Sequence, residues 1–169
     1  NPNEEIIELE HKNKSKVIVD GAQAAAHFKI NLSEINVDYY VASAHKLCGP
    51  TGVGFLYGKS ELLEALPPYQ GGGEMISSVT FEKTEYADLP YKFEAGTPNI
   101  SGVIGFGAAI DYMNDIGFDN IESYEQELLK YATDRLKEIS GIKIYGNSVN
   151  KISVISFNLS SHHPSDLSL

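Results

Sequence analysis

The sequence contains very little cysteine and no tryptophan. Cys48 is the only cysteine among 169 residues, which excludes an internal disulfide and a CxxC metal site. An isolated cysteine is by default interpreted as a small buried apolar residue. Long hydrophobic runs are also missing, because none reaches the roughly 18 residues that a membrane-spanning helix needs.

Basic residues are few as well. The chain has 13 Lys and Arg against 23 Asp and Glu, a formal net charge of −10. Nucleic acids and anionic membrane surfaces bind through clustered Lys and Arg, so we expect neither as a partner. Residues 1–5 lack the basic and apolar regions of a signal peptide, and we therefore expect a cytoplasmic protein.

Apolar residues recur at helical spacing in some segments and form short β-branched runs in others. The expected helices are residues 1–13, opened by Asn1 and Pro2, residues 60–66, capped by Ser60, and residues 100–116, 120–140 and 164–167. The expected strands are residues 17–19, 38–42, 53–57, 142–145 and 153–158. Residues 69–99 have little periodicity, so we expect a long loop there, which in a compact domain usually has a function.

These elements predict an α/β protein with two parts. Residues 1–116 alternate helices and strands, whereas residues 117–169 read as one helix followed by two strands, a pattern typical of a small α+β domain. The strand 53–57 follows a tight Gly-Pro-Thr-Gly turn, so we expect it to run antiparallel to the strand 38–42.

Lys46 is the first candidate functional residue, because it comes just after a buried strand. Ligands bind at strand ends in open α/β sheets, and partial desolvation there would lower the pKa of a lysine and make its amine nucleophilic. The alternative is a solvated turn lysine, which is the commoner case for lysine alone.

Asp20 strengthens the functional interpretation, because it ends the buried strand 17–19. A carboxylate and a lysine at the ends of neighbouring parallel strands would converge at one edge of the sheet. This pair matches pyridoxal phosphate chemistry, in which a lysine forms the Schiff base and an acid keeps the pyridine nitrogen protonated.

Four ordered motifs extend this pattern over nearly the whole chain. They are Asp20-Gly21-Ala22-Gln23, Ser43-Ala44-His45-Lys46 with Gly49-Pro50-Thr51-Gly52, Gly71-Gly72-Gly73 with Met75-Ile76, and residues 93–99 (FEAGTPN). In order and spacing they resemble the SUF-type cysteine desulfurases, fold-type I pyridoxal phosphate enzymes of the class V aminotransferase group. The resemblance implies that residues 1–116 belong to the large cofactor-binding domain, with a mostly parallel sheet, and residues 117–169 to the small C-terminal domain.

The resemblance also implies a reaction. L-Cysteine would be converted to L-alanine, and its sulfur would become an enzyme-bound persulfide, for transfer to a sulfur-acceptor protein in iron–sulfur cluster assembly. Lys46 would form the Schiff base and then move the substrate's α-proton, Asp20 would pair with the pyridinium nitrogen, and Gln23 would bind the phenolic oxygen.

The remaining residues implied by the resemblance bind phosphate. Ser43 and His45 would hold the phosphate of their own subunit. Thr97 and the region of Gly71 would complete the phosphate site of a neighbouring subunit in a homodimer. No metal site is expected, since His162 and His163 have no carboxylate or thiol at a matching spacing.

One residue departs from the family pattern, and other parts of the pattern are not found. Cys48 stands where an aromatic residue is expected. The nucleophilic cysteine and the substrate-binding arginine are expected beyond Leu169, and roughly the first half of the large domain is expected before residue 1. A selenocysteine lyase, an aminotransferase and a non-catalytic fragment that serves as an interaction module remain as alternatives.

Overall fold

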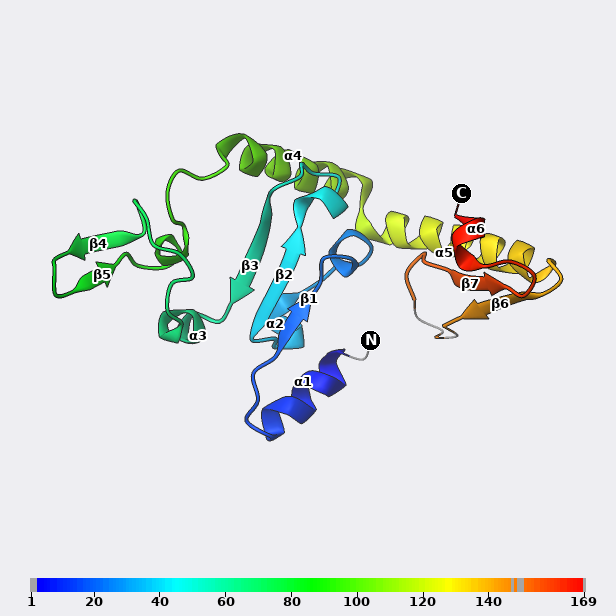
Figure 1. Cartoon of the computed structure of the whole chain (residues 1–169), viewed down its shortest axis with the longest axis horizontal. Coiled ribbons are helices and arrows are strands. Elements are labelled where there is room, and N and C mark those ends of the chain that lie inside the picture. Colours follow the sequence, from blue (N-terminus) through cyan, green and yellow to red (C-terminus); the bar gives the residue numbers. More distant parts are fainter. Residues whose placement is uncertain (1–2, 147, 149–150, 169) are drawn as a thin grey trace. The chain divides into compact units, whose positions relative to one another are not determined.

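The structure is a computed structural model that describes residues 3–146, 148 and 151–168. The chain forms two compact units, which are described separately (Figure 1). The first contains the described residues up to Ala26 together with Ile30–Asp115. The second contains His27–Lys29 and the described residues from Ile116 onward.

A three-stranded sheet in the order β1-β2-β3 is the centre of the first unit. Its strands are β1 (Ile18–Asp20), β2 (Tyr39–Ser43) and β3 (Gly54–Gly58). β1 and β2 are parallel, and β2 and β3 are antiparallel, as the tight turn predicted. These three strands are therefore of mixed direction, because the turn after Lys46 reverses the chain.

Helices and short helical turns complete this unit. They are α1 (Asn3–Lys12), α2 (Leu32–Ile35), α3 (Ser60–Ala65), α4 (Ile100–Ile116) and the 3₁₀ turns η1 (Ala24–Ala26), η2 (Ala44–Lys46) and η3 (Tyr91–Phe93). The predicted bounds of α4 are confirmed. Ser60 is the first residue of α3 and not its cap, because Lys59 occupies the N-cap position. The predicted start at Asn1 and Pro2 lies outside the described residues.

The core of the first unit collects around β2. Alternate residues Tyr40, Ala42 and Ala44 are buried, as expected for one face of a strand that continues into η2. Phe106 of α4 is buried in the same cluster. The Phe55 ring is stacked between Tyr40 and Phe106, at 6.2 and 6.3 Å between centroids. Aromatic and small side chains thus pack helix α4 against the sheet.

The segment 69–99 is more ordered than its sequence predicted. It contains a hairpin of β4 (Ile76–Val79) and β5 (Thr84–Tyr86), paired antiparallel, followed by η3. All residues of both strands are exposed, so no alternation of buried and polar residues marks them in the sequence. Hydrogen bonds such as Ser78 Oγ to Glu85 Oε2, at 2.9 Å, support the pairing instead.

The second unit contains a long helix and a short antiparallel pair. Its elements are α5 (Phe118–Lys137), β6 (Ile142–Tyr145), β7 (Ser156–Leu159) and α6 (Pro164–Leu167). The predicted strand at 142–145 and the helix start at 164–167 are confirmed. Asn147, Val149 and Asn150 of the predicted turn lie outside the described residues. Among the described helices, none is long and apolar enough to cross a membrane.

A buried carboxylate joins four segments of the first unit at the start of β2. Asp38 is 1% exposed. Its Oδ2 accepts hydrogen bonds from Val17 N, at 2.9 Å, and from His11 Nε2, at 2.8 Å. Its Oδ1 lies 3.3 Å from Lys59 Nζ and 3.8 Å from Lys16 Nζ. Burial raises the pKa of Asp38, but the hydrogen bonds and the Lys59 charge outweigh it and lower that pKa to about 2.

This network predicts a specific loss of stability in acid. Because the folded-state pKa of Asp38 lies below its ordinary value of 3.8, the ionised carboxylate stabilises the fold above that pH. Its contribution, about 2 kcal/mol by linkage, is lost as the pH falls toward 2. We expect Asp38→Asn to lower the free energy of unfolding at pH 7 by about 3 kcal/mol, since it removes the anion that compensates Lys59, whose side chain is only 23% exposed.

Chemical denaturation of the two proteins between pH 7 and 2 tests this prediction. Asp134→Asn is the control, because Asp134 is 55% exposed in its ion pair with Lys130 and exposed pairs contribute little. Equal losses in the two variants, or an unchanged acid dependence in Asp38→Asn, would contradict the role of the network.

Candidate functional site

Lys46 lies on the turn that follows the carboxyl end of β2. The turn is held by backbone hydrogen bonds from Ala44 N to Val53 O (3.0 Å), and from Leu47 N (2.8 Å) and Gly49 N (2.9 Å) to Ala44 O. Ala44 and Leu47 are buried, which anchors the turn on both sides of Lys46. Lys46 itself is exposed. The described residues therefore do not provide the partial desolvation that we expected for its amine.

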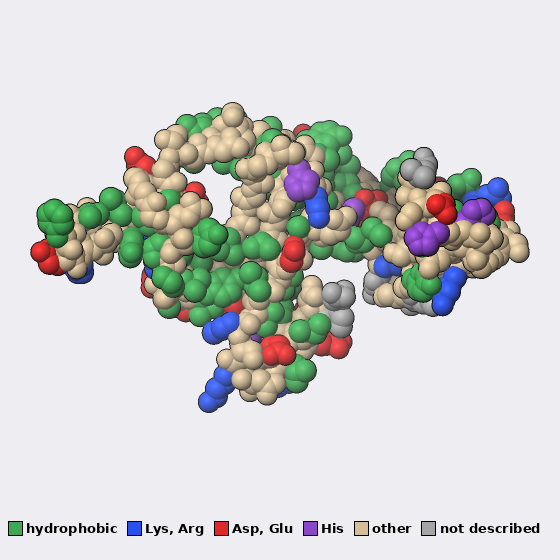
Figure 2. All heavy atoms as spheres, in the orientation of Figure 1, with side chains coloured by type: hydrophobic (Ala, Val, Ile, Leu, Met, Phe, Trp, Pro, Cys, Tyr) green, Lys and Arg blue, Asp and Glu red, His purple; other side chains and the backbone are tan. Residues whose placement is uncertain are grey.

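Asp20 is the last residue of β1 and pairs in register with Val41 of β2. Because the two strands are parallel, their carboxyl ends lie at one edge of the sheet (Figure 1). Asp20 Oδ1 accepts a hydrogen bond from Ala22 N at 2.9 Å, which holds the carboxylate at the strand end. Histidine, basic and acidic side chains are exposed near these strand ends on the face shown in Figure 2.

The glycine after Asp20 is required by a close approach of Tyr40. The Tyr40 hydroxyl donates a 3.4 Å hydrogen bond to Gly21 O, and a Cβ on Gly21 would lie 1.8 Å from that hydroxyl oxygen. Burial, and to a smaller extent the Asp20 charge, raise the pKa of Tyr40. The tyrosine therefore fixes the path of the backbone directly after the candidate carboxylate.

The other residues expected to bind cofactor fall into two groups. Gln23, Ser43 and His45 lie on the same two strand-end connections as Asp20 and Lys46; Gln23 and His45 are exposed, and Ser43 is half-buried. Gly71 and Thr97 are exposed on two loops at either side of the β4–β5 hairpin.

The second group is ordered by contacts between its own loops. Gly73 O accepts a 2.9 Å hydrogen bond from Gly96 N, and a Cβ on Gly72 would lie 3.4 Å from that of Ala95. The loops that carry Gly71 and Thr97 are therefore brought side by side, although they are distant in the sequence.

Cys48 is not the buried apolar residue that its isolation suggested. It is exposed, and its φ of 59° lies in the left-handed region, which a residue with a side chain rarely adopts. Its Sγ donates to Met113 Sδ at 3.8 Å. The expectation fails because Leu47 takes the buried position of this turn.

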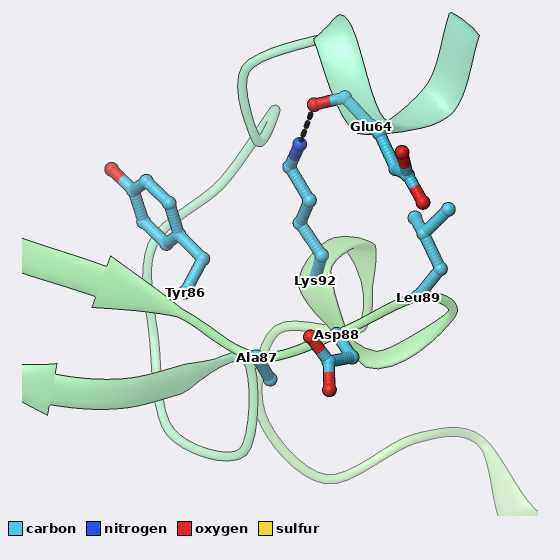
Figure 3. A pocket seen from close by; sticks show the side chains of 6 residues that line it. All are labelled: Glu64, Tyr86, Ala87, Asp88, Leu89 and Lys92. Atoms are coloured by element: carbon cyan, nitrogen blue, oxygen red, sulfur yellow. Dashed lines mark hydrogen bonds between the residues drawn. The ribbon is translucent and has the colours of Figure 1, made fainter. Parts of the chain in front are cut away.

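A separate open cavity of about 500 Å³ lies between α3 and the end of β5 (Figure 3). It is lined by Glu64, Tyr86, Ala87, Asp88, Leu89 and Lys92. Lys92 Nζ donates to Glu64 O at 2.7 Å and to Leu63 O at 3.3 Å, so its charge caps the carbonyl end of α3. The cavity includes none of the expected site residues, and the sequence did not predict it because it depends on the hairpin.

Histidine and acidic residues do not gather into a metal centre in the part of the chain that the structure describes, where no group of three potential ligands is found. His163 Nδ1 accepts from Ser165 N at 3.3 Å and caps α6. His162 Nδ1 is 2.7 Å from Ser161 Oγ.

Comparison with known proteins identifies the family. The model of the class V aminotransferases matches residues 1–169, and the chain belongs to this family. A cysteine desulfurase of Shigella sonnei is 47% identical over 168 residues, which are 99% of this chain and 41% of that protein. A probable cysteine desulfurase of Synechocystis is 47% identical over 170 residues, 99% of this chain and 40% of that protein. The chain thus spans about two fifths of the length of these relatives.

Solved structures agree with this assignment. The cysteine desulfurase CsdA of Escherichia coli has a TM-score of 0.92 at 40% identity, with 98% of this chain and 41% of that chain covered. The apo cysteine desulfurase of Thermococcus onnurineus also has a TM-score of 0.92, at 35% identity and with coverage of 98% and 42%. The predicted α/β fold class and the predicted likeness to cysteine desulfurases are therefore confirmed.

The fit between Gly21 and Tyr40 predicts a large effect of one added methyl group. We expect Gly21→Ala to lower the free energy of unfolding by about 3 kcal/mol, because a buried ring must move to admit the Cβ. Gly107→Ala is the matched control, since a Cβ there meets no atom within 4 Å. Gly107→Ala should raise the free energy of unfolding by about 0.5–1 kcal/mol, because alanine has a higher helix propensity than glycine. Denaturant titration measures both, and a neutral Gly21→Ala would contradict the close approach.

Proposed function

We propose that this chain carries the lysine-bearing part of a cysteine desulfurase. Such an enzyme uses pyridoxal phosphate to remove sulfur from L-cysteine, leaving L-alanine and a persulfide on the enzyme. The observation that carries the proposal is the parallel pairing of β1 and β2, which puts the Asp20 carboxylate and the connection bearing Lys46 at one edge of the sheet. The names of the relatives at 47% identity support the choice of substrate.

The side chains at this edge fit the cofactor by their chemistry. The amine of Lys46 makes no hydrogen bond or ion pair with the described residues, so it is free to bind an aldehyde. Lys59 is different, because its amine is bonded to Asn36 and Asp38. Ser43 and His45 add a hydroxyl and an imidazole, which are suitable donors to a phosphate.

The proposed roles follow from what each group can do. When bound, the cofactor supplies an electron sink that stabilises negative charge at the substrate's α-carbon. Asp20, held by Ala22 N, would favour a protonated ring nitrogen by its negative charge. Lys46 would bind the cofactor and would later hold the proton taken from the α-carbon. Gln23 would donate a hydrogen bond to the phenolic oxygen.

The proposal extends to a homodimer and a sulfur-acceptor protein. The loops of Gly71 and Thr97, tied together by the Gly96–Gly73 hydrogen bond, would complete the phosphate site of a second subunit. In this proposal the first unit belongs to the large cofactor-binding domain and the second to the small C-terminal domain. The persulfide would be passed to the acceptor for iron–sulfur cluster assembly.

Borohydride trapping tests the assignment of Lys46. Reduction of the protein loaded with pyridoxal phosphate should leave the cofactor on the peptide that contains Lys46, because only an imine at that amine is trapped. Peptide mass spectrometry locates the label, and Lys46→Ala should abolish it. Label on Lys59, or no label at all on a folded protein, would refute the proposed site.

Cys48 is expected not to be the persulfide-forming residue. A thiol that attacks the substrate's sulfur must be able to reach it, whereas Cys48, although exposed, is held in a turn with its Sγ 3.8 Å from Met113 Sδ. In the whole protein, Cys48→Ser should leave the formation of sulfide and alanine from L-cysteine unchanged. Loss of both products, with pyridoxal phosphate still bound, would place the nucleophile at Cys48.

A further inference from the structure

The carbonyl end of helix α3 lacks hydrogen-bond donors of its own. The residues three and four positions after Glu64 are Pro67 and Pro68, and proline has no backbone N–H. Glu64 O therefore cannot accept a hydrogen bond that continues the helix, and it needs a donor from elsewhere. Lys92 supplies this donor from Nζ, at 2.7 Å (Figure 3). The same Nζ also donates to Leu63 O at 3.3 Å.

Lys92 differs from the other lysine of the segment 69–99 in its surroundings. Lys83 is 71% exposed, and Glu85, its partner in an ion pair, is 51% exposed. Lys92 is half-buried, and its Nζ lies 5.5 Å from the centre of the Phe93 ring. Exposed pairs contribute little because water screens them, whereas a cation over an aromatic ring is held more strongly when it is partly desolvated. Lys92 is therefore the lysine that is expected to constrain this segment.

Helix α3 is itself fixed to the sheet at two points. Lys59, its N-cap residue, donates to Asn36 Oδ1 at 2.8 Å and lies 3.3 Å from the buried carboxylate of Asp38. Leu63 lies against the end of β3, since a Cβ on Gly58 would be 2.7 Å from Leu63 Cδ2. A side chain that binds the carbonyl end of α3 is therefore positioned relative to the sheet.

The segment that follows Lys92 leads directly to Thr97, one of the candidate phosphate-binding residues. Between them, Gly96 N donates to Gly73 O at 2.9 Å, so the loops on either side of the β4–β5 hairpin share one contact. Gly73 O also accepts from Met75 N at 2.9 Å, and Met75 is fully buried. A shift of the chain at Lys92 would therefore move both loops.

We propose that Lys92 is a positioning residue, which fixes the two candidate phosphate-binding loops relative to the sheet by binding the carbonyl end of α3. The inference rests on the proposed function for the roles of Gly71 and Thr97 at the phosphate. Lys92 does not need to touch the cofactor, because its Nζ is bound to Glu64 O and Leu63 O.

Lys92→Met tests the proposal, because methionine keeps an unbranched side chain but cannot donate to a carbonyl. In the whole protein we expect faster hydrogen exchange of the Gly96 amide, whose bond to Gly73 O depends on the position of this segment. We also expect the dissociation constant for pyridoxal phosphate, followed by visible absorption, to rise about tenfold, the effect of losing one charged hydrogen bond. Lys83→Met is the matched control. It breaks only the exposed pair with Glu85 and should change neither measurement.

Lys92→Arg separates positioning from general stability. Its guanidinium still donates N–H groups to the carbonyls, so both measurements should return toward those of the unsubstituted protein. If Lys92→Met does not fold, Lys92→Gln, which keeps a donor on a shorter side chain, is measured instead and should change both in the same direction. A lower melting temperature with an unchanged dissociation constant and unchanged exchange at Gly96 would overturn the proposal.

The test also separates this proposal from the proposed function. Failure of the unsubstituted protein to bind pyridoxal phosphate would overturn the proposed function. The exchange of the Gly96 amide in Lys92→Met would then still decide whether Lys92 holds the two loops, because that measurement does not need the cofactor.

Discussion

The parallel pairing of β1 with β2 is the constraint on which the rest of the first unit depends. Its register sets Asp20 beside Val41, so both strands end at the same edge, and each is followed by a tight connection. A shift of one residue would turn the buried face of β2 outward, and Tyr40 could then no longer cover Gly21. The register of β1 and β2 therefore determines both the packing of the core and the position of the Asp20 carboxylate.

Polar groups hold this strand pair from both ends. At the start of β2, buried Asp38 joins Val17, His11 and Lys59. At the far end, backbone hydrogen bonds hold the turns after both strands. Because the carboxylate of Asp38 is satisfied by several donors, its burial supports the fold. The candidate site can then consist mainly of exposed side chains on turns whose backbone is held by hydrogen bonds.

Elements with strong local signals could be predicted from the sequence, and elements stabilised by exposed contacts could not. Helix α4 has the predicted bounds because its largely apolar run is followed by Gly117. Strand β6 has them because Ile142 and Ile144 alternate with exposed Lys143 and Tyr145. The β4–β5 hairpin was missed because its residues are exposed on both faces. Cys48 was misplaced because burial in a turn depends on which neighbour, here Leu47, fills the available core position.

The sequence by itself determined the family, the α/β class and the identity of the candidate residues, since these follow from residue types at given spacings. Only the tertiary structure decided which of them share an edge, that Lys46 is exposed, and that Gly71 and Thr97 lie on neighbouring loops. The hydrogen bond between His27, on the connection after β1, and Glu125, on α5, was likewise decided only by the tertiary structure, because the two residues are far apart in the sequence. Contacts of this kind depend on the three-dimensional path of the chain, and no local pattern of residues encodes them.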